Sequence, residues 1–329
     1  MDYKKKLSEL IDSGIESNVK LAIQLSKSTN TPLNVNEYEE IFNWILEYGE
    51  YDTIEPTTRL ETKIIRLISL TKLWWSVKNT TKIPASIRKI KNLEVLQLSG
   101  SRLKTLPESF GELSNLESIL LNGNQIKSLP KSFIKLSNLE ELVLSSNQLE
   151  NLPQNWAQLK KLKSIKMQNN KFKEFPSEFL SLPSLELLDL SNNPIEQLSD
   201  KIYKLYPIKK LRLSQTKINS VPASIGELIN LETLDLSQNY ISHIPDSICN
   251  LKTLEILNLF NNNLNSLPVR FENLNKLRVL NIAENNFDNL PPQIFKLKNL
   301  EVLNITGNNI PQHQIIRFKI KQPNCTLRK

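Results

Sequence analysis

A unit of 23 residues recurs along most of this 329-residue chain without a change of register. The unit reads L-x-x-L-x-L-x-x-N-x-L-x-x-L-P-x-x-I/F-x-x-L-x-x, with small variations between copies. A constant period in this range predicts a solenoid, in which each repeat stacks on the next. Eleven copies fill residues 70–322, and their first positions are Leu70, Leu93, Leu116, Leu139, Leu162, Leu185, Ile208, Leu231, Leu254, Leu277 and Leu300.

The first half of each unit predicts a short strand with one buried face. In the copy that begins at Leu231, for example, Leu234 and Leu236 alternate with polar residues, which is the pattern of a half-buried strand. One such strand cannot bury its leucines alone. We therefore expect neighbouring copies to pair in a parallel sheet.

An asparagine follows the predicted strand in eight copies. Its amide group can donate two hydrogen bonds and accept others, so a buried asparagine at a turn can satisfy backbone groups of its own and the neighbouring coil. We prefer this hydrogen-bond ladder to a role in ligand binding. The column consists of Asn124, Asn147, Asn170, Asn193, Asn239, Asn262, Asn285 and Asn308.

A proline marks the second half of the unit in nine copies, and Ser199 replaces it once. Proline fixes φ and lacks an N–H group, so this segment predicts the start of a short helical turn and not a strand. A strand on one side and a wider helical turn on the other bend the stack, which places the strands on the concave face. The column consists of Pro84, Pro107, Pro130, Pro153, Pro176, Pro222, Pro245, Pro268 and Pro291.

The L-P-x-x-I/F-x-x-L-x-x-L pattern at a constant 23 residues resembles the Ras-group class of leucine-rich repeat proteins, which includes plant intracellular members, Ras-pathway scaffolds and many bacterial proteins. The resemblance covers residues 70–322. It implies an α/β fold, a right-handed horseshoe solenoid with a parallel β-sheet on the concave face and short helical turns on the convex face. It also implies that the chain binds another protein, mostly through the concave face.

Both ends of the array have sequences that predict caps. Residues 1–69 lack the repeat, carry apolar residues at helical spacing, and end in a degenerate half-repeat. We expect a helical N-terminal cap, with Trp44, Trp74 and Trp75 at its junction with the first coil. A separate recognition module in this segment is the alternative. Residues 311–329 resemble a C-terminal cap common in bacterial relatives, in which a helix, a turn and a closing strand overlap the last repeat.

The positions of the cysteines and histidines give no indication of a cofactor site or a metal site. Cys249 and Cys325 lie in different parts of the array, and His243 and His313 have no metal-ligand spacing with them. The absence of cysteine from the N-terminal cap favours a reducing cytoplasm. We also see no signal peptide and no transmembrane segment, so we expect a cytoplasmic protein.

Motifs for catalysis are missing as well. The sequence contains no glycine-rich phosphate loop and no credible Ser-His-Asp arrangement. We therefore expect a protein that is not an enzyme and has no small-molecule substrate.

The charge is unevenly distributed along the chain. Of the net charge of +8, residues 1–69 hold 8 basic and 12 acidic residues, giving −4, and the remainder holds 34 and 22, giving +12. A basic array leaves an alternative function, electrostatic binding of nucleic acid or an anionic membrane. We rank it second because no basic stripe follows one face, and because lysine-rich usage also arises in AT-rich genomes.

The residues between the strand leucines should point to the concave side. In one interpretation, Lys166, Asp189, Arg212 and Asp235 form a ladder of mutually paired charges. In the other, the cations meet acidic groups of a protein partner, and exposed apolar residues such as Phe260 provide anchors. The candidate partner-binding residues are Leu120, Val143, Lys166, Asp189, Lys210, Arg212, Asp235, Tyr240, Asn258 and Phe260.

Overall fold

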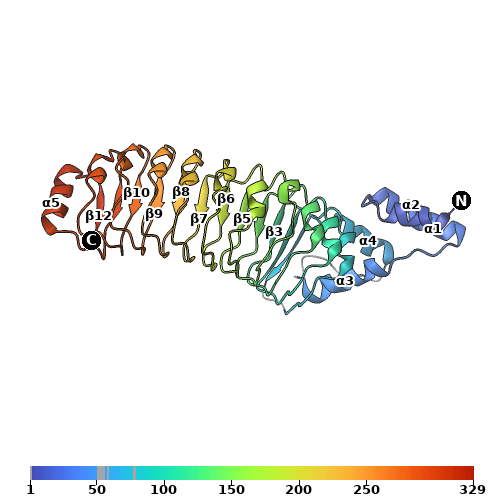
Figure 1. Ribbon diagram of the computed structural model, residues 1–329. Coiled ribbons are helices and arrows are strands. Elements are labelled where there is room, and N and C mark those ends of the chain that lie inside the picture. Colours follow the sequence, from blue (N-terminus) through green and yellow to red (C-terminus); the bar gives the residue numbers. More distant parts are fainter. Residues whose placement is uncertain (1, 50–55, 58, 77–78) are drawn as a thin grey trace. The chain divides into compact units, whose positions relative to one another are not determined.

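The computed structural model describes residues 2–49, 56–57, 59–76 and 79–329. Its twelve strands belong to one sheet and follow one another in sequence order (Figure 1), and the chain divides into two compact units, residues 1–148 with 152–162 and residues 149–151 with 163–329. Within each unit the neighbouring strands are parallel. The predicted solenoid of stacked repeats is therefore confirmed.

The first unit begins with four helices and continues with repeats in which a short 3-10 helix, labelled η, follows each strand. The helices are α1 (Tyr3–Ile11), α2 (Glu16–Thr29), α3 (Asn36–Tyr48) and α4 (Leu60–Ser69). The repeats contain β1 (Lys72–Ser76), η1 (Ala85–Lys89), β2 (Val95–Ser99), η2 (Glu108–Glu112), β3 (Ser118–Leu120), η3 (Lys131–Lys135), β4 (Glu141–Val143) and η4 (Trp156–Gln158).

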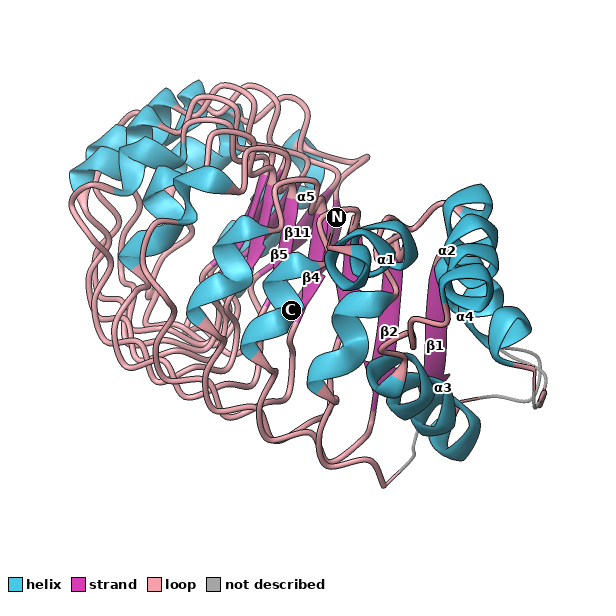
Figure 2. Cartoon of the chain, turned by 90° about the vertical axis from the view of Figure 1, so that its right-hand side faces the viewer, coloured by secondary structure: helices cyan, strands magenta, loops and turns pink. Residues whose placement is uncertain are grey.

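The second unit repeats this alternation, and Figure 2 shows the strand on one side of a coil and the short helix on the other. It ends as predicted, with a helix and a closing strand that pairs with β11. Its elements are β5 (Ser164–Lys166), η5 (Ser177–Ser181), β6 (Leu187–Asp189), η6 (Ile202–Leu205), β7 (Lys210–Arg212), η7 (Ala223–Glu227), β8 (Thr233–Asp235), η8 (Asp246–Asn250), β9 (Ile256–Asn258), η9 (Phe271–Asn273), β10 (Val279–Asn281), η10 (Pro292–Lys296), β11 (Val302–Asn304), α5 (Gln312–Lys321) and β12 (Thr326–Arg328).

The core of each coil is built from the apolar positions of the repeat. In the coil that contains β8, all seven of these side chains are at most 1% exposed. Burial of each contributes about 1.5–3 kcal/mol before the conformational entropy of the chain is subtracted. The seven residues are Leu231, Leu234, Leu236, Ile241, Ile244, Ile248 and Leu251.

The proline column has the predicted role. Pro222 directly precedes η7 with φ of −68°, and Pro245 directly precedes η8 with φ of −67°. These values are those that the pyrrolidine ring imposes. Proline thus ends the extended segment and begins the helical turn of the coil.

The asparagine column forms the predicted ladder, as Asn262 illustrates. Its Oδ1 accepts a hydrogen bond from the N–H of Ile241 at 3.0 Å, and its Nδ2 donates to the carbonyl oxygens of Leu236 and Leu259 at 2.9 and 3.2 Å. Ile241 and Leu236 belong to the preceding coil. One buried side chain therefore satisfies backbone groups of two coils and fixes the register between them.

Ser101 and Thr216 occupy the asparagine position in two further coils. The residue before each of these ten positions adopts a left-handed backbone, with φ between 52° and 72°. The sequence did not indicate this conformation, because only three of the ten residues are glycine. A left-handed conformation costs a residue with a side chain about 1–2 kcal/mol, which the buried ladder must offset. The ten residues are Gly100, Gly123, Ser146, Asn169, Asn192, Gln215, Gln238, Asn261, Glu284 and Gly307.

The ladder predicts that alanine substitutions at two adjacent asparagines have very different effects on the free energy of unfolding. Asn262→Ala should lower the free energy of unfolding by about 2–3 kcal/mol, because it leaves buried backbone groups without partners. Asn263→Ala should change it by less than about 0.5 kcal/mol, because Asn263 is exposed. Urea denaturation monitored by circular dichroism measures both values. Equal midpoints for the two variants would show that the ladder does not hold the coils together.

The helical prediction for the N-terminal segment is confirmed, with one correction at the tryptophans. Trp44 of α3 packs edge-on against Trp75 of β1, with ring centroids 4.9 Å apart, and Trp75 is fully buried. Trp74, which we placed at the same junction, is 48% exposed. Adjacent residues of a strand point to opposite faces, so only one of the pair can face the helices.

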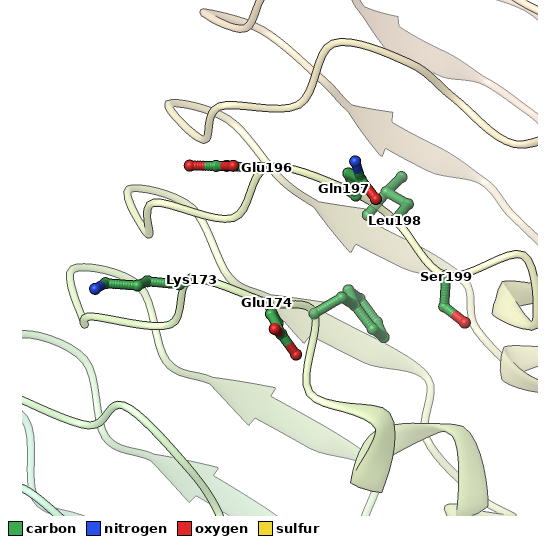
Figure 3. Close-up of a pocket in the computed structure, with 7 residues that line it drawn as sticks. Lys173, Glu174, Glu196, Gln197, Leu198 and Ser199 are labelled. Atoms are coloured by element: carbon green, nitrogen blue, oxygen red, sulfur yellow. The ribbon is translucent and has the colours of Figure 1, made fainter.

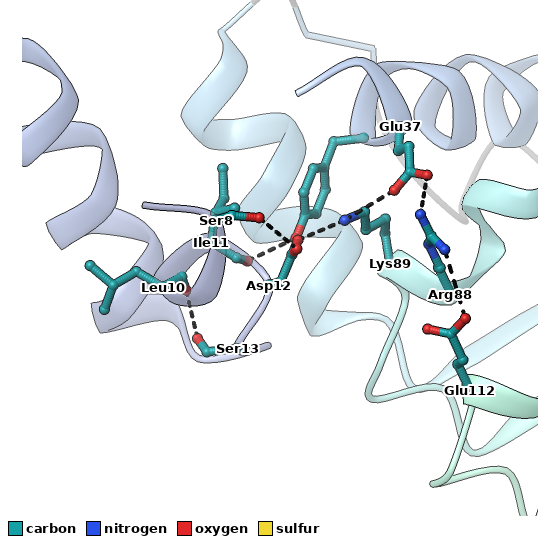
Figure 4. Close-up of polar contacts among 10 residues, drawn as sticks. Ser8, Leu10, Ile11, Asp12, Ser13, Glu37, Arg88, Lys89 and Glu112 are labelled. Atoms are coloured by element: carbon teal, nitrogen blue, oxygen red, sulfur yellow. Dashed lines mark hydrogen bonds and ion pairs between the residues drawn. The ribbon is translucent and has the colours of Figure 1, made fainter. Parts of the chain in front are cut away.

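A polar cluster joins the N-terminal helices to the first repeat (Figure 4). The Nζ of Lys89 in η1 lies 2.7 Å from Oδ1 of Asp12 and 3.0 Å from Oε2 of Glu37. Arg88 contacts Glu37 as well, and the hydroxyl of Tyr38 donates to the carbonyl oxygen of Ile11 at 2.8 Å. We call this set the cap cluster. It connects the C-terminal end of α1 and the first turn of α3 to η1.

The cap cluster changes the acidity of its two carboxyl groups. Burial alone would raise the pKa of Asp12, but hydrogen bonds from Lys89 and Tyr38 outweigh it and hold the pKa below its usual value. Burial likewise opposes the hydrogen bonds from Lys89 and Arg88 at Glu37, whose pKa is also lowered. Groups with a depressed pKa in the folded state stabilise it above their unfolded pKa of about 4, and this contribution is lost as the pH falls further.

Removal of the Lys89 charge should loosen the N-terminal cap. We expect Lys89→Met to lower the stability of this region by about 1–3 kcal/mol, because two partly buried carboxylates lose their cation. The wild type should lose the same contacts as the pH falls below about 4. Tryptophan fluorescence reports both changes through Trp44 and Trp75. The control is Lys20→Met, which removes an exposed pair with Glu16; a shift of equal size in that variant would contradict the assignment.

Candidate protein-binding surface

The strand register of the second unit places one row of outward-facing side chains next to one another. Successive strands pair Lys166 with Asp189, Asp189 with Arg212, and Arg212 with Asp235. The row continues through Asn258. Leu188 and Leu211, which precede Asp189 and Arg212 on their strands, are fully buried, as the predicted alternation requires. Asp189 itself is only 7% exposed, so the prediction that it is available on the surface is wrong.

Two predicted residues lie in the first unit. Leu120 of β3 is paired with Val143 of β4, and both side chains are half-buried. They form a small apolar area on the face of that unit's sheet. Lys166, in the second unit, is also half-buried.

The charges of the row do not pair as a continuous ladder. Nη1 of Arg212 lies 3.7 Å from Oδ2 of Asp189, whose Oδ1 accepts a hydrogen bond from the N–H of Ser191 at 3.1 Å. Asp235 instead accepts hydrogen bonds from the N–H and the hydroxyl of Ser237, at 3.0 and 2.6 Å. Asp235 lies opposite Arg212 in the register, but no ion pair of Asp235 is found among the described residues, so the interpretation as a continuous ladder of paired charges fails at this position. A local turn interaction two residues along the chain replaces the cross-strand pair.

Arg212 keeps a large part of its surface available. Its side chain is 44% exposed, whereas that of Asp189 is 10% exposed. The Arg212 guanidinium can therefore contact an external acceptor while it remains within ion-pair distance of Asp189. Lys210, on the same strand, is exposed, and no ion pair of Lys210 is found among the described residues.

The two coils that follow β7 each carry an exposed aromatic or aliphatic side chain. Tyr240 follows β8 and is 60% exposed, and Ile256 of β9 is 39% exposed. Ile256 lies two strands from Lys210 in the same row, with Thr233 between them. Ile256 is not among the residues that the sequence predicts for this surface, because single-strand alternation cannot indicate how much of a side chain stays exposed.

Phe260 is less exposed than the anchor that we expected, because its side chain is half-buried. Its row neighbours Ser237 and Ala283 are 6% and 1% exposed, so this row is recessed relative to Tyr240. Phe260 can therefore contribute only part of its side chain to a contact. We call the set of Lys210, Arg212, Asp235, Tyr240, Ile256, Asn258 and Phe260 the β7–β9 patch.

A shallow hollow lies elsewhere in the second unit (Figure 3). It measures about 330 Å³ and lies between two neighbouring coils, with Phe175 and Leu198 as its apolar lining and Ser199 at the position where other coils have proline. Lys173 and Glu196 point away from Leu198 and Ser199 in this view. The hollow is at the lower limit of ligand pockets in size. It is large enough for one side chain of a partner.

The described ranges, 2–49, 56–57, 59–76 and 79–329, contain neither a candidate metal site nor a candidate membrane-spanning helix. No group of three or more His, Cys, Asp or Glu side chains in them could hold a metal ion. None of their helices combines the length and apolar character that crossing a bilayer requires.

Comparison with protein families assigns the repeat. Models of the leucine rich repeat match residues 78–126, 91–149, 137–195 and 276–297, and a model of a leucine-rich repeat region matches residues 196–263. Together these matches cover more than half of the chain. No curated protein matches the sequence.

Several solved structures are similar to this chain. A TDR receptor is 26% identical with a TM-score of 0.70, over 80% of this chain and 47% of the receptor. The receptor kinase HAESA of Arabidopsis, solved with the peptide hormone IDA and the co-receptor SERK1, is 26% identical with a TM-score of 0.64, over 73% of this chain and 42% of that one. This chain thus spans less than half of either receptor. An internalin (inlF) of Listeria monocytogenes shares the fold, at 18% identity, a TM-score of 0.64 and coverages of 89% and 87%.

Proposed function

The chain belongs to the leucine-rich repeat proteins, and we propose that it is a non-enzymatic module that recognises a protein partner through the β7–β9 patch. This patch would lie on the concave face of the solenoid. Scaffold, adaptor and effector roles all use such recognition. The proposal includes a cytoplasmic location, which the two free, buried cysteines support, and the Ras-group class of repeat, which the constant 23-residue register supports.

The observation that carries the proposal is the combination of side chains on three adjacent coils. Arg212 and Lys210 provide cations, and Tyr240 and Ile256 provide exposed apolar surface on the next two coils. Tyrosine and arginine are enriched among the residues that dominate binding energy at protein interfaces. The strands beneath them are fixed by the asparagine ladder, so little conformational entropy is lost when a partner binds.

The chemistry of the patch indicates the partner. Asp189 on β6 is buried and lies 3.7 Å from Arg212, and Asp235 on β8 accepts hydrogen bonds from Ser237. The charges that remain available to a partner are therefore those of Lys210 and Arg212, which are positive. An acidic segment with an apolar or aromatic residue would match both features. HAESA, which is similar over 73% of this chain, was solved with a peptide hormone and a co-receptor protein, and that precedent supports a peptide or protein partner.

Ion pairing within the repeats favours this function over electrostatic binding of nucleic acid or membrane by the whole array. Arg278 is bidentate with Glu301 at 2.8 and 2.9 Å, and Lys209 and Lys296 each lie 3.0 Å from a glutamate. Cations that are already paired attract an external polyanion less strongly. The excess positive charge of the array is thus partly neutralised where the coils stack.

The proposal predicts loss of binding when the β7–β9 patch is changed. In a pull-down from the native organism, followed by titration of the captured protein, Lys210→Glu with Tyr240→Ala should weaken binding by roughly tenfold or more, because both an anchor and the charge match are lost. Both side chains are exposed, so folding should be unaffected. Circular dichroism checks this point.

A matched control exists on another side of the coil. Lys204→Glu with Tyr206→Ala changes the same residue types at exposed positions of η6 and the turn after it. This variant should bind as the wild type does. If it loses binding while the patch variant retains it, the interface lies on the helical side, and the proposed surface is wrong.

A further inference from the structure

The C-terminal helix α5 (Figure 1) has two faces of different character. Ile315 and Phe318 are 7% and 0% exposed and pack into the end of the second unit. Ile316 and Ile320, in contrast, are 50% and 74% exposed. Residues four apart lie on the same side of a helix, so the two isoleucines form an apolar stripe that faces away from the core.

Basic residues border this stripe on both sides. At 100° per residue, Lys319 falls on one flank of the stripe, and Arg317 and Lys321 fall on the other. All three are exposed, and the described part of the chain contains no ion pair of any of them. Residues 302–329 hold five basic residues and no acidic ones. The helix therefore differs from the repeats, where stacked coils pair their charges.

An aromatic contact holds the helix in this orientation. The ring of Phe318 lies edge-on to that of Phe295, with centroids 5.6 Å apart. Arg317 and Lys321 lie 5.6 and 5.7 Å from the Phe295 ring, which is within the range of cation–π attraction. The apolar stripe and its basic borders are thus presented on a fixed helix.

We propose that α5 docks on an anionic lipid surface. The isoleucines would enter the boundary between headgroups and acyl chains, while the lysines and Arg317 reach the lipid phosphates and carboxylates. Interfacial helices have this arrangement of an apolar stripe between basic flanks. A planar lipid surface offers negative charge on both sides of the stripe at once, whereas an acidic protein would need carboxylates placed to match both flanks. The surface is separate from the β7–β9 patch, so the inference does not depend on the proposed function.

Co-sedimentation with vesicles tests the proposal. The full chain should partition onto vesicles of phosphatidylcholine with phosphatidylserine, but not onto phosphatidylcholine alone, and partitioning should fall as salt rises. Ile316→Ser with Ile320→Ser should weaken it by roughly tenfold or more, since both apolar contacts are lost. Lys319→Glu with Lys321→Glu should weaken it similarly, because attraction to the anionic surface becomes repulsion.

A control variant separates this helix from general electrostatics. Val269→Ser with Arg270→Glu changes an apolar and a basic residue that are also exposed, but in another coil, and should partition as the wild type does. Absence of wild-type binding, unchanged binding by the isoleucine variant, or equal loss in the control would each overturn the proposal. Binding of an acidic peptide to α5 without vesicle binding would also overturn it and identify a protein as the occupant.

Discussion

The hydrogen bonds of the asparagine ladder are the interaction on which the rest of the structure depends. Each buried amide satisfies an N–H and a carbonyl group of the preceding coil, as Asn262 does with Ile241 and Leu236. Without these bonds, the turn after every strand would bury unpaired backbone groups, at a cost of about 1–3 kcal/mol each. The residue before each ladder position must adopt a left-handed backbone for this arrangement to form, and this conformation is strained where the residue is not glycine.

The ladder also determines which side chains of neighbouring strands lie next to one another on the surface. Because it fixes the register between coils, equivalent positions of neighbouring strands lie side by side, and single residues combine into a surface across them. Arg212 is held by Asp189 one strand away, and Tyr240 and Ile256 come from the next two coils. No repeat alone contains the patch. Recognition is therefore a property of the stack, and variation at the exposed positions can change it without disturbing the core.

Secondary structure that depends on the spacing of residue types could be predicted from the sequence. Side-chain exposure and hydrogen bonding that depend on residues of neighbouring coils could not. The strands, the ladder and the proline turns follow from repeated residue types, and the helices of the N-terminal segment follow from apolar residues at helical spacing; the structure contains all of them. The half-burial of Phe260 depends on the recessed row that contains Ala283, and the hydrogen bonds of Asp235 depend on Ser237. The left-handed conformation of Gln238 and Glu284 has no signal in residue type. The exposure of Ile316 and Ile320 emerged only once the packed side of α5 was known.

Hydroxyl-radical footprinting of the protein, free and bound to its captured partner, tests the central claim most directly because it reports the solvent exposure of individual side chains. Tyr240 and Ile256 should become protected in the complex. Tyr206 and Val269, which are 58% and 77% exposed and lie outside the patch, should remain labelled. Protection of Tyr206 or Val269 with unchanged labelling of Tyr240 and Ile256 would contradict recognition through the β7–β9 patch.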